Sequence, residues 1–301
     1  MTTTIPGAAP VAVIAGGGHR PRLPALASPR ARSTKLVASF ILAVVGVLFL
    51  VPLGWILLAA FDPAATVSIG LPDALTLSNF TEILNIDQTF RPLWNSAVLS
   101  LGTAVITVVC SVLAAYPLSR YQQRFKKPFL YGVLFGTCLP ITAMMVPVYA
   151  LFVSLKLLDS LTGTVLFLAA TSLPMAIWMT KNFMDSIPIS LEEAAWVDGA
   201  SAMRALWTIV VPLMRQGIAV VFIFVFTQAW GNFFVPFVLL FSPENQPAAV
   251  AIYGFFGNYG TVAYGKLAAF SLLYSAPVLA LYLLVQRLSG SSFAMAGAVK
   301  G

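Results

Sequence analysis

Six long apolar stretches dominate the sequence, and none of them contains Asp, Glu, Lys, Arg or His. They span residues 36–61, 93–118, 129–155, 164–180, 216–241 and 267–286. A helix needs about 20 mostly apolar residues to cross the hydrocarbon layer of a bilayer, and backbone groups within lipid must be hydrogen-bonded inside the protein. We therefore predict an all-α membrane protein with six transmembrane helices.

The basic residues are distributed unevenly between the segments that join these stretches. Fourteen of the Lys and Arg residues lie on one set of alternating segments, which includes both termini, and only Arg91, Lys156 and Lys266 lie on the other set. Lys and Arg are enriched in the cytoplasmic loops of membrane proteins, so both termini are predicted to be cytoplasmic. The net charge of +7 then reflects membrane topology, and nucleic acid is not an expected partner.

The absence of charged residues from the apolar stretches also restricts the function. Ion-coupled carriers usually keep ionisable groups within the membrane, and a membrane-embedded hydrolase needs a catalytic base or metal ligand at depth. A secondary carrier or channel therefore remains only as the rival class. The polar residues within the stretches are neutral, which suits an uncharged, hydroxyl-rich solute: they include Asn95, Ser111, Thr137, Thr142, Thr171, Gln228 and Asn232.

Cys110 and Cys138 both lie within apolar stretches, and His19 is the only histidine. These residues predict neither a disulfide framework nor a metal site. Residues 1–34 contain Arg, Pro, Gly and Ala but no acidic residue, and we expect a disordered cytoplasmic tail, with an organelle transit peptide as the alternative. The transmembrane domain is expected at residues 35–289, and a second cytoplasmic tail at residues 290–301.

A short polar segment separates the fourth and fifth stretches. Pro188 precedes it and Gly199 follows its acidic, Ala-rich part, and both residue types mark the ends of helices. We expect a helix at about residues 189–203 that docks on a partner, because carboxylates accept hydrogen bonds from Arg or Lys and small residues permit close approach. The residues expected to make this contact are Glu193, Ala194, Ala195, Asp198, Gly199 and Ala200.

Two motifs resemble those of a known family. The run from Glu193 to Ala200, followed after a gap of nine residues from Gly199 by Ile209-Val210-Val211-Pro212, is similar to the EAA loop of ABC-importer membrane subunits, with Val211 in place of the usual Leu. The last residues, Gly297-Ala298-Val299-Lys300-Gly301, resemble the tail of permeases of the maltose-type carbohydrate uptake family. The resemblance covers most of residues 36–301.

This resemblance implies a type I ABC importer permease fold with a cytoplasmic coupling helix. It implies a bacterial inner-membrane complex with a sister permease, two ABC ATPase subunits and an extracytoplasmic solute-binding protein. The complex would import an oligo- or disaccharide by ATP-driven alternating access, with a glycerol-phosphate-type solute as the alternative. The chain itself would be a transport subunit in contact with lipid, neither an enzyme nor the carrier of a cofactor.

ATP and magnesium are expected in the partner ATPases and not in this chain. Residues 260–266 match most of the sequence of a phosphate-binding loop, but the match is incomplete. Leu267 stands where such a loop needs a Ser or Thr to bind magnesium.

Three further groups of residues are candidates for contact. The fifth stretch contains aromatic rings and amides, which are groups that bind sugars in pockets. The candidates for a substrate pathway are Gln228, Trp230, Asn232 and Phe233. The alternative is that these residues pack between helices. Residues 242–265 form a loop rich in Gly and aromatic residues, expected to meet the binding protein or, alternatively, to act as a cap; its candidates are Phe255, Phe256, Asn258 and Tyr259. The tail residues Gly297, Val299, Lys300 and Gly301 are expected to contact the ATPases.

Overall fold

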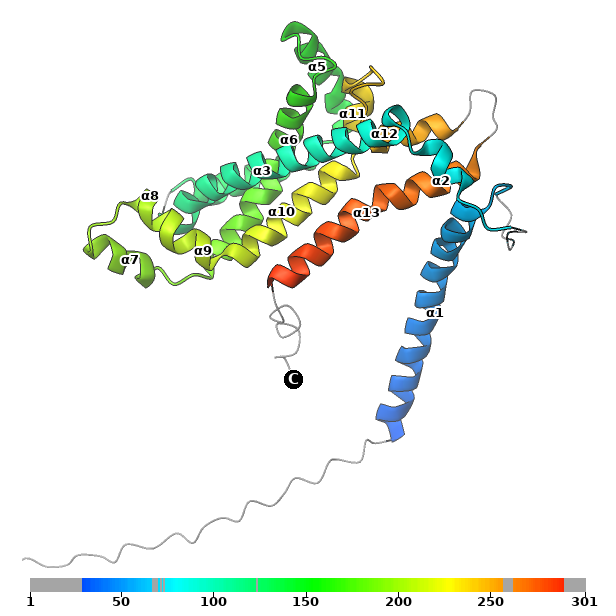
Figure 1. Ribbon diagram of the computed structural model, residues 1–301. Coiled ribbons are helices and arrows are strands. Elements are labelled where there is room, and N and C mark those ends of the chain that lie inside the picture. The colour runs from blue at the N-terminus through cyan, green and yellow to red at the C-terminus, as the bar shows by residue number, and fades with distance from the viewer. Residues whose placement is uncertain are drawn as a thin grey trace, which may run out of the picture. The chain divides into compact units, whose positions relative to one another are not determined.

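The computed structural model describes residues 29–66, 70, 72, 74–122, 124–256 and 262–289, and this part of the chain is almost entirely helical (Figure 1). Contacts divide the chain into two compact units, Met1–Pro52 and Leu53–Gly301. The described part of the first unit is the beginning of α1 (Pro29–Phe61), a helix that starts before the predicted apolar stretch does. Apart from α1, all elements discussed below belong to the second unit.

Four helical segments in the described residues are long and apolar enough to cross a membrane. They are Val37–Phe61, Ile86–Arg120, Leu161–Asp185 and Tyr264–Arg287. Two bent pairs raise this number to six if each pair counts as one span: Lys126–Gly136 with Ile141–Ser154, bent by 90°, and Ala202–Leu213 with Arg215–Trp230, bent by 80°. The prediction of an all-α membrane protein is confirmed, with four to six candidate spans.

Two of the predicted spans differ in form from the expectation. The third is broken into α4 (Lys126–Gly136) and α5 (Ile141–Ser154), because Pro140 has extended backbone angles immediately before α5 and proline lacks the N–H needed to continue a helix. The fifth was expected to reach residue 241. Instead α10 (Arg215–Trp230) ends at Gly231, and α11 (Phe234–Leu239) is a separate short helix.

Three helices form the central packing of the second unit, and Figure 1 shows them side by side: α3 (Arg91–Arg120), α6 (Leu161–Asp185) and α10. Leu99 of α3 packs with Val165 near the start of α6, and Ala115 packs with Met184 near the end of α6. These two helices therefore run parallel. Alternating spans run in the same direction, so this arrangement agrees with the predicted order of crossings.

Short elements surround the two ends of α3. At the Arg91 end lie α2 (Ser78–Ile83), the π-helix η1 (Ile86–Phe90), α12 (Ala248–Ala251) and the 3-10 helix η3 (Ile252–Phe255), followed by the long helix α13 (Tyr264–Ser289). At the Arg120 end lie α7 (Ser190–Val197), α8 (Ala202–Ala205), the π-helix η2 (Leu206–Val210) and α9 (Val211–Leu213). Apolar side chains close each end: Ile83 and Phe270 are fully buried at the first, and Leu206 and Val210 at the second.

Candidate functional site

The predicted docking helix is α7, and its C-terminal end is set by Gly199. The N–H groups of Gly199 and Ala200 bond the carbonyls of Trp196 and Ala195, while Gly199 has a φ of +83°. These two bonds, with a glycine in the left-handed region, make a Schellman ending. The helix thus stops at Val197, and a second helix, α8, follows Ser201, where the expectation placed one helix at about residues 189–203.

The two adjacent glutamates of α7 face opposite environments. Glu193 is exposed, as are Ala194, Asp198 and Gly199, whereas Glu192 is fully buried. The surface around the exposed residues is also apolar, since the side chain of Val197 is 88% exposed and those of Leu191 and Met203 are exposed as well. Exposed apolar residues grouped with acceptors mark an interaction surface more often than a solvated face.

The buried Glu192 forms an ion pair with Arg120, the last residue of α3. The Arg120 Nε and Glu192 Oε1 atoms are 2.6 Å apart, and the two side chains are 5% and 0% exposed. Arg120 also donates from Nη1 to the Ser119 hydroxyl at 3.3 Å, and that hydroxyl donates to Asp185 Oδ1 at 2.5 Å. Asp185 in turn pairs with Lys181. A connected set of polar side chains therefore joins α7 to the ends of α3 and α6.

Sequence reasoning missed this ion pair, although a signal for it was present. Successive residues on a helix point about 100° apart, so one of two adjacent acidic residues can face outward while the other points toward the protein. Arg120 lies two residues after the end of the second apolar stretch, where a cation at a helix C-terminus is favourable. Arg120 and Glu192 are far apart in the sequence, so only the structure could show that they form a pair.

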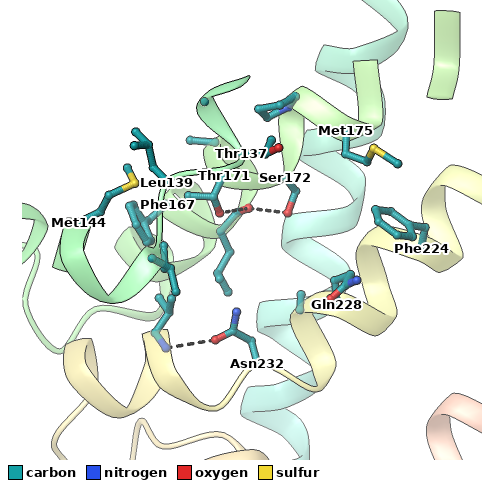
Figure 2. A pocket seen from close by; sticks show the side chains of 17 residues that line it. Thr137, Leu139, Met144, Phe167, Thr171, Ser172, Met175, Phe224, Gln228 and Asn232 are labelled. Carbon is teal, nitrogen blue, oxygen red and sulfur yellow. Dashed lines mark hydrogen bonds between the residues drawn. The ribbon is translucent and has the colours of Figure 1, made fainter. Parts of the chain in front are cut away.

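A cavity of about 740 Å³ lies between the bend of α4 and α5, the middle of α6 and the end of α10 (Figure 2). None of the residues that line it is Asp, Glu, Lys, Arg or His. Its polar groups are the side chains of Thr137, Thr171, Ser172, Gln228 and Asn232, and its apolar groups include Met144, Phe167, Met175 and Phe224. The cavity therefore offers neutral hydrogen-bonding groups beside apolar surface.

The hydrogen bonds within the cavity define what it can offer a ligand. The hydroxyls of Thr137, Thr171 and Ser172 donate to backbone carbonyls of their own helices, so toward a ligand their oxygens act as acceptors. Asn232 accepts from the Val235 N–H through Oδ1 at 3.1 Å, which leaves its amide nitrogen as a donor. Gln228 supplies both a donor and an acceptor. This combination matches the needs of a solute with several hydroxyl groups.

Of the four residues predicted for the substrate pathway, the structure brings Gln228 and Asn232 to the cavity and turns Trp230 and Phe233 elsewhere. Trp230 is buried against α13, where its Nε1 donates to the Tyr274 carbonyl at 3.2 Å and the Tyr274 hydroxyl donates to the Trp230 carbonyl at 2.7 Å. Phe233 stacks on Phe237 at a centroid distance of 5.0 Å. The Trp230 contacts are packing between helices, which was the alternative interpretation for this stretch, whereas Phe233 and Phe237 are one turn apart in the same segment and both are exposed.

Of the candidates in the 242–265 loop, one packs within the protein and one is exposed. Phe255 packs on Phe270 at a centroid distance of 5.1 Å, whereas Phe256 is 48% exposed. Asn258 and Tyr259 lie outside the described residues, as do the tail residues Gly297, Val299, Lys300 and Gly301 and the predicted tail at residues 290–301. Of the tail predicted at residues 1–34, residues 1–28 lie outside the described residues, whereas residues 29–34 belong to α1.

The fold and these features define a class of protein: a helical, multi-span membrane protein with an uncharged cavity and a short helix that projects a mixed acidic and apolar surface. A family model described as "Binding-protein-dependent transport system inner membrane component" matches residues 107–291. The chain belongs to this family. It is thus an inner-membrane, multi-pass permease of a binding-protein-dependent ABC importer, and a transport component rather than an enzyme.

Individual relatives agree with this assignment. A putative ABC transporter permease protein of Streptomyces antibioticus is 35% identical over 230 residues, which cover 76% of this chain and 100% of the relative. The trehalose transport system permease protein SugB of Mycobacterium tuberculosis is 31% identical over 255 residues, covering 84% of this chain and 93% of the relative. Among solved structures, one chain of a bacterial ABC transporter involved in the import of alginate has a TM-score of 0.76 at 23% identity, covering 86% of this chain and 98% of that chain.

Proposed function

We propose that this chain is a permease subunit of an ATP-driven importer of a neutral sugar, an oligo- or disaccharide. The observation that carries the proposal is the uncharged cavity, in which Gln228 and Asn232 supply amide groups beside the aromatic rings of Phe167 and Phe224. Sugars are bound by such a combination, since amides bond hydroxyls and aromatic rings cover the apolar face of the ring. The similarity to a trehalose permease supports the same solute class.

The alternative solute, a glycerol-phosphate ester, is less well matched by the cavity. A phosphate is normally bound by Arg, Lys or a helix N-terminus, and neither Arg nor Lys lines the cavity. A buried phosphate without a counter-charge would be strongly unfavourable. A neutral solute has no such requirement, so we favour the sugar.

The proposed mechanism is alternating access driven by partner subunits. In this proposal ATP and magnesium bind the two ATPases, α7 docks on one of them through Glu193 and the exposed apolar residues beside it, and the resulting movement opens the cavity to the other side of the membrane. The sister permease completes the pathway. The solute-binding protein delivers the sugar near the 242–265 loop, and the residues at Gly297–Gly301 contact the ATPases.

The proposal also fixes the orientation, with both termini and α7 in the cytoplasm and the 242–265 loop outside. Cysteines introduced as Ser201→Cys and Ser242→Cys test this, because an impermeant thiol reagent added to intact spheroplasts should label only the second. Labelling of Ser201→Cys alone would reverse the topology.

Uptake measurements test the substrate. Cells that carry the complete transporter should accumulate radiolabelled trehalose or another neutral sugar, and excess glycerol 3-phosphate should not compete. Gln228→Leu should reduce this uptake severalfold, whereas Thr227→Val, on the same helix but outside the cavity lining, should leave it close to wild type. Uptake of glycerol 3-phosphate instead of any neutral sugar would refute the proposal.

A further inference from the structure

The Arg91 end of α3 holds the loop between α11 and α13. Asn95 is buried, and its amide nitrogen donates to the backbone carbonyls of Glu244 at 2.8 Å and Gln246 at 3.1 Å. The neighbouring hydroxyl of Ser96 accepts a hydrogen bond from the Ala248 N–H at 2.9 Å. Ala248 is the first residue of α12, whose N–H groups have no partners within the helix. Two adjacent side chains of α3 thus fix both the loop and the start of α12.

The other end of the same helix holds α7. Arg120 is the last residue of α3 and Glu192 lies in the first turn of α7, and their ion pair is almost completely buried. A cation is favoured at a helix C-terminus and an anion at a helix N-terminus. Each charge therefore sits at the helix end that stabilises it, and the pair connects the end of one helix to the beginning of the other.

Between these two attachments α3 is continuous. It comprises 30 residues, with Pro117 in its last turns, and at 1.5 Å per residue it is about 45 Å long. A helix is much stiffer along its axis than a loop, because each turn is hydrogen-bonded to the next. Movement imposed on one end of α3 is therefore delivered to the other end.

We propose that α3 is a mechanical link between α7 and the loop at residues 242–256, with Asn95, Ser96, Arg120 and Glu192 as its positioning residues. The proposal rests on the function proposed above, in which α7 meets an ATPase and this loop meets the binding protein. Nucleotide binding at the ATPases would then change the state of the loop through α3. By the reciprocity of coupled sites, occupation of the loop by the binding protein would also act on α7.

Hydrogen exchange on the assembled transporter in nanodiscs tests the link without any sugar. Deuterium uptake is measured for peptides that cover Ala248–Phe256, with and without magnesium and a non-hydrolysable ATP analogue. In the wild type the analogue should change exchange in this segment, although it binds at the opposite end of the complex. Asn95→Leu and Glu192→Gln should each remove at least half of that change.

Ser100→Ala provides the matched control. The Ser100 hydroxyl is buried on the same helix and has no hydrogen-bond partner among the described residues, so its removal alters α3 without releasing either end. The nucleotide-dependent change should remain complete in this variant. A merely structural effect of Asn95→Leu would lower the melting temperature but leave the change in exchange intact.

The double variant Asn95→Leu/Glu192→Gln separates one link from two independent effects. Substitutions far apart usually act additively, whereas two breaks in the same link should give no greater loss than the stronger single variant. An absent response in the wild type, or a full response in both single variants, would overturn the proposal. If Glu192→Gln fails to assemble, Asn95→Leu decides alone. Failure of the sugar assay would refute the proposed substrate and leave these results unaffected.

Discussion

The Arg120 end of α3 and the cavity differ in the kind of polar residue that each contains. At the Arg120 end, charged side chains are connected in pairs: Arg120 and Glu192 form a buried pair, and the partly buried Lys181 pairs with the exposed Asp185. The cavity, in contrast, is lined by hydroxyls, amides and apolar groups without a charged residue. Charges serve where fixed geometry between helices is needed, because a buried pair that loses one partner is strongly destabilised. Under the proposed function, neutral groups line the place where a solute must bind and leave.

The same contrast occurs within α7, between two consecutive residues. Glu192 points inward to Arg120, and Glu193 points outward to solvent. The first holds the helix in place, while the second remains available for a partner. Substitutions at these positions should therefore have different effects, although the residues are chemically identical.

The largest effect is expected from Glu192→Lys. This change places a second cation beside Arg120 in a buried position, and breaking a buried ion pair costs about 3–5 kcal/mol. The permease should fail to accumulate in folded form, as judged by fluorescence-detected size-exclusion chromatography. Glu193→Lys is the matched control: it should fold normally but lose uptake, because only the contact with the partner is changed. Equal amounts of folded protein for both variants would contradict the division of roles.

A substitution in the cavity tests whether its lining must remain uncharged. Gln228→Glu keeps the size of the side chain but introduces a charge, and translocon scales place the cost of Asp, Lys or Arg at the centre of a membrane helix at about 2.5–3.5 kcal/mol. Sugar uptake should fall by roughly 100-fold at pH 7, since about 1.4 kcal/mol corresponds to a factor of ten. It should recover in part at pH 5, as the new carboxyl becomes protonated.

The control for this experiment is Gln216→Glu, which makes the same change at an exposed position outside the cavity lining. Its uptake should remain close to that of the wild type at both pH values. If Gln228→Glu transports as well as Gln216→Glu, the cavity is not the solute pathway.

The end of α7 gives a smaller and purely conformational test. Gly199 has a positive φ, and a Cβ added there would meet nothing within 4 Å in the described part of the chain. Any loss on substitution must therefore come from backbone strain or from contact with a partner. A left-handed backbone costs an L-residue roughly 1–2 kcal/mol, so Gly199→Val should reduce coupled ATP hydrolysis by about tenfold.

Gly199→Asn separates these two causes. Asn adopts the left-handed region more readily than Val, although it is also larger than Gly. Activity close to wild type in Gly199→Asn would assign the loss to strain. An equal loss in both variants would show that the surface of a partner lies against this position.

The sequence predicted the helical class, because long apolar runs are a local feature, but it placed a single helix at about residues 189–203, where α7 ends at Val197 and α8 follows. It did not predict the break at Pro140, since proline is common in membrane helices and only packing decides whether it bends one. For Trp230 and Gln228 the sequence supplied part of the answer. Residues two apart on a helix point to opposite sides, so the spacing indicated that only one of these two residues could face the cavity. It did not indicate which one.

The smallest expected effect concerns Asp159, which holds the segment after α11. Its carboxylate oxygen accepts hydrogen bonds from the N–H groups of Phe241 and Ser242, each at 3.1 Å. Burial raises the pKa of Asp159, but the hydrogen bonds from Ser242, Asn245 and Phe241 outweigh it, and the pKa is lowered overall. Because the folded-state pKa lies below the unfolded one of about 4, the stabilisation is complete above pH 4 and is lost as the pH falls through the folded-state value.

Asp159→Asn should therefore lower the melting temperature slightly at neutral pH, because its neutral amide oxygen accepts these bonds less strongly than a carboxylate. Asn tolerates the positive φ of 57° at this position, so the backbone should be undisturbed. The difference from the wild type should be below about 1 kcal/mol for a partly exposed group, and it should shrink as the pH is lowered from 5 to 3. A difference that stays constant across this range would show that the charge of Asp159 does not support the loop.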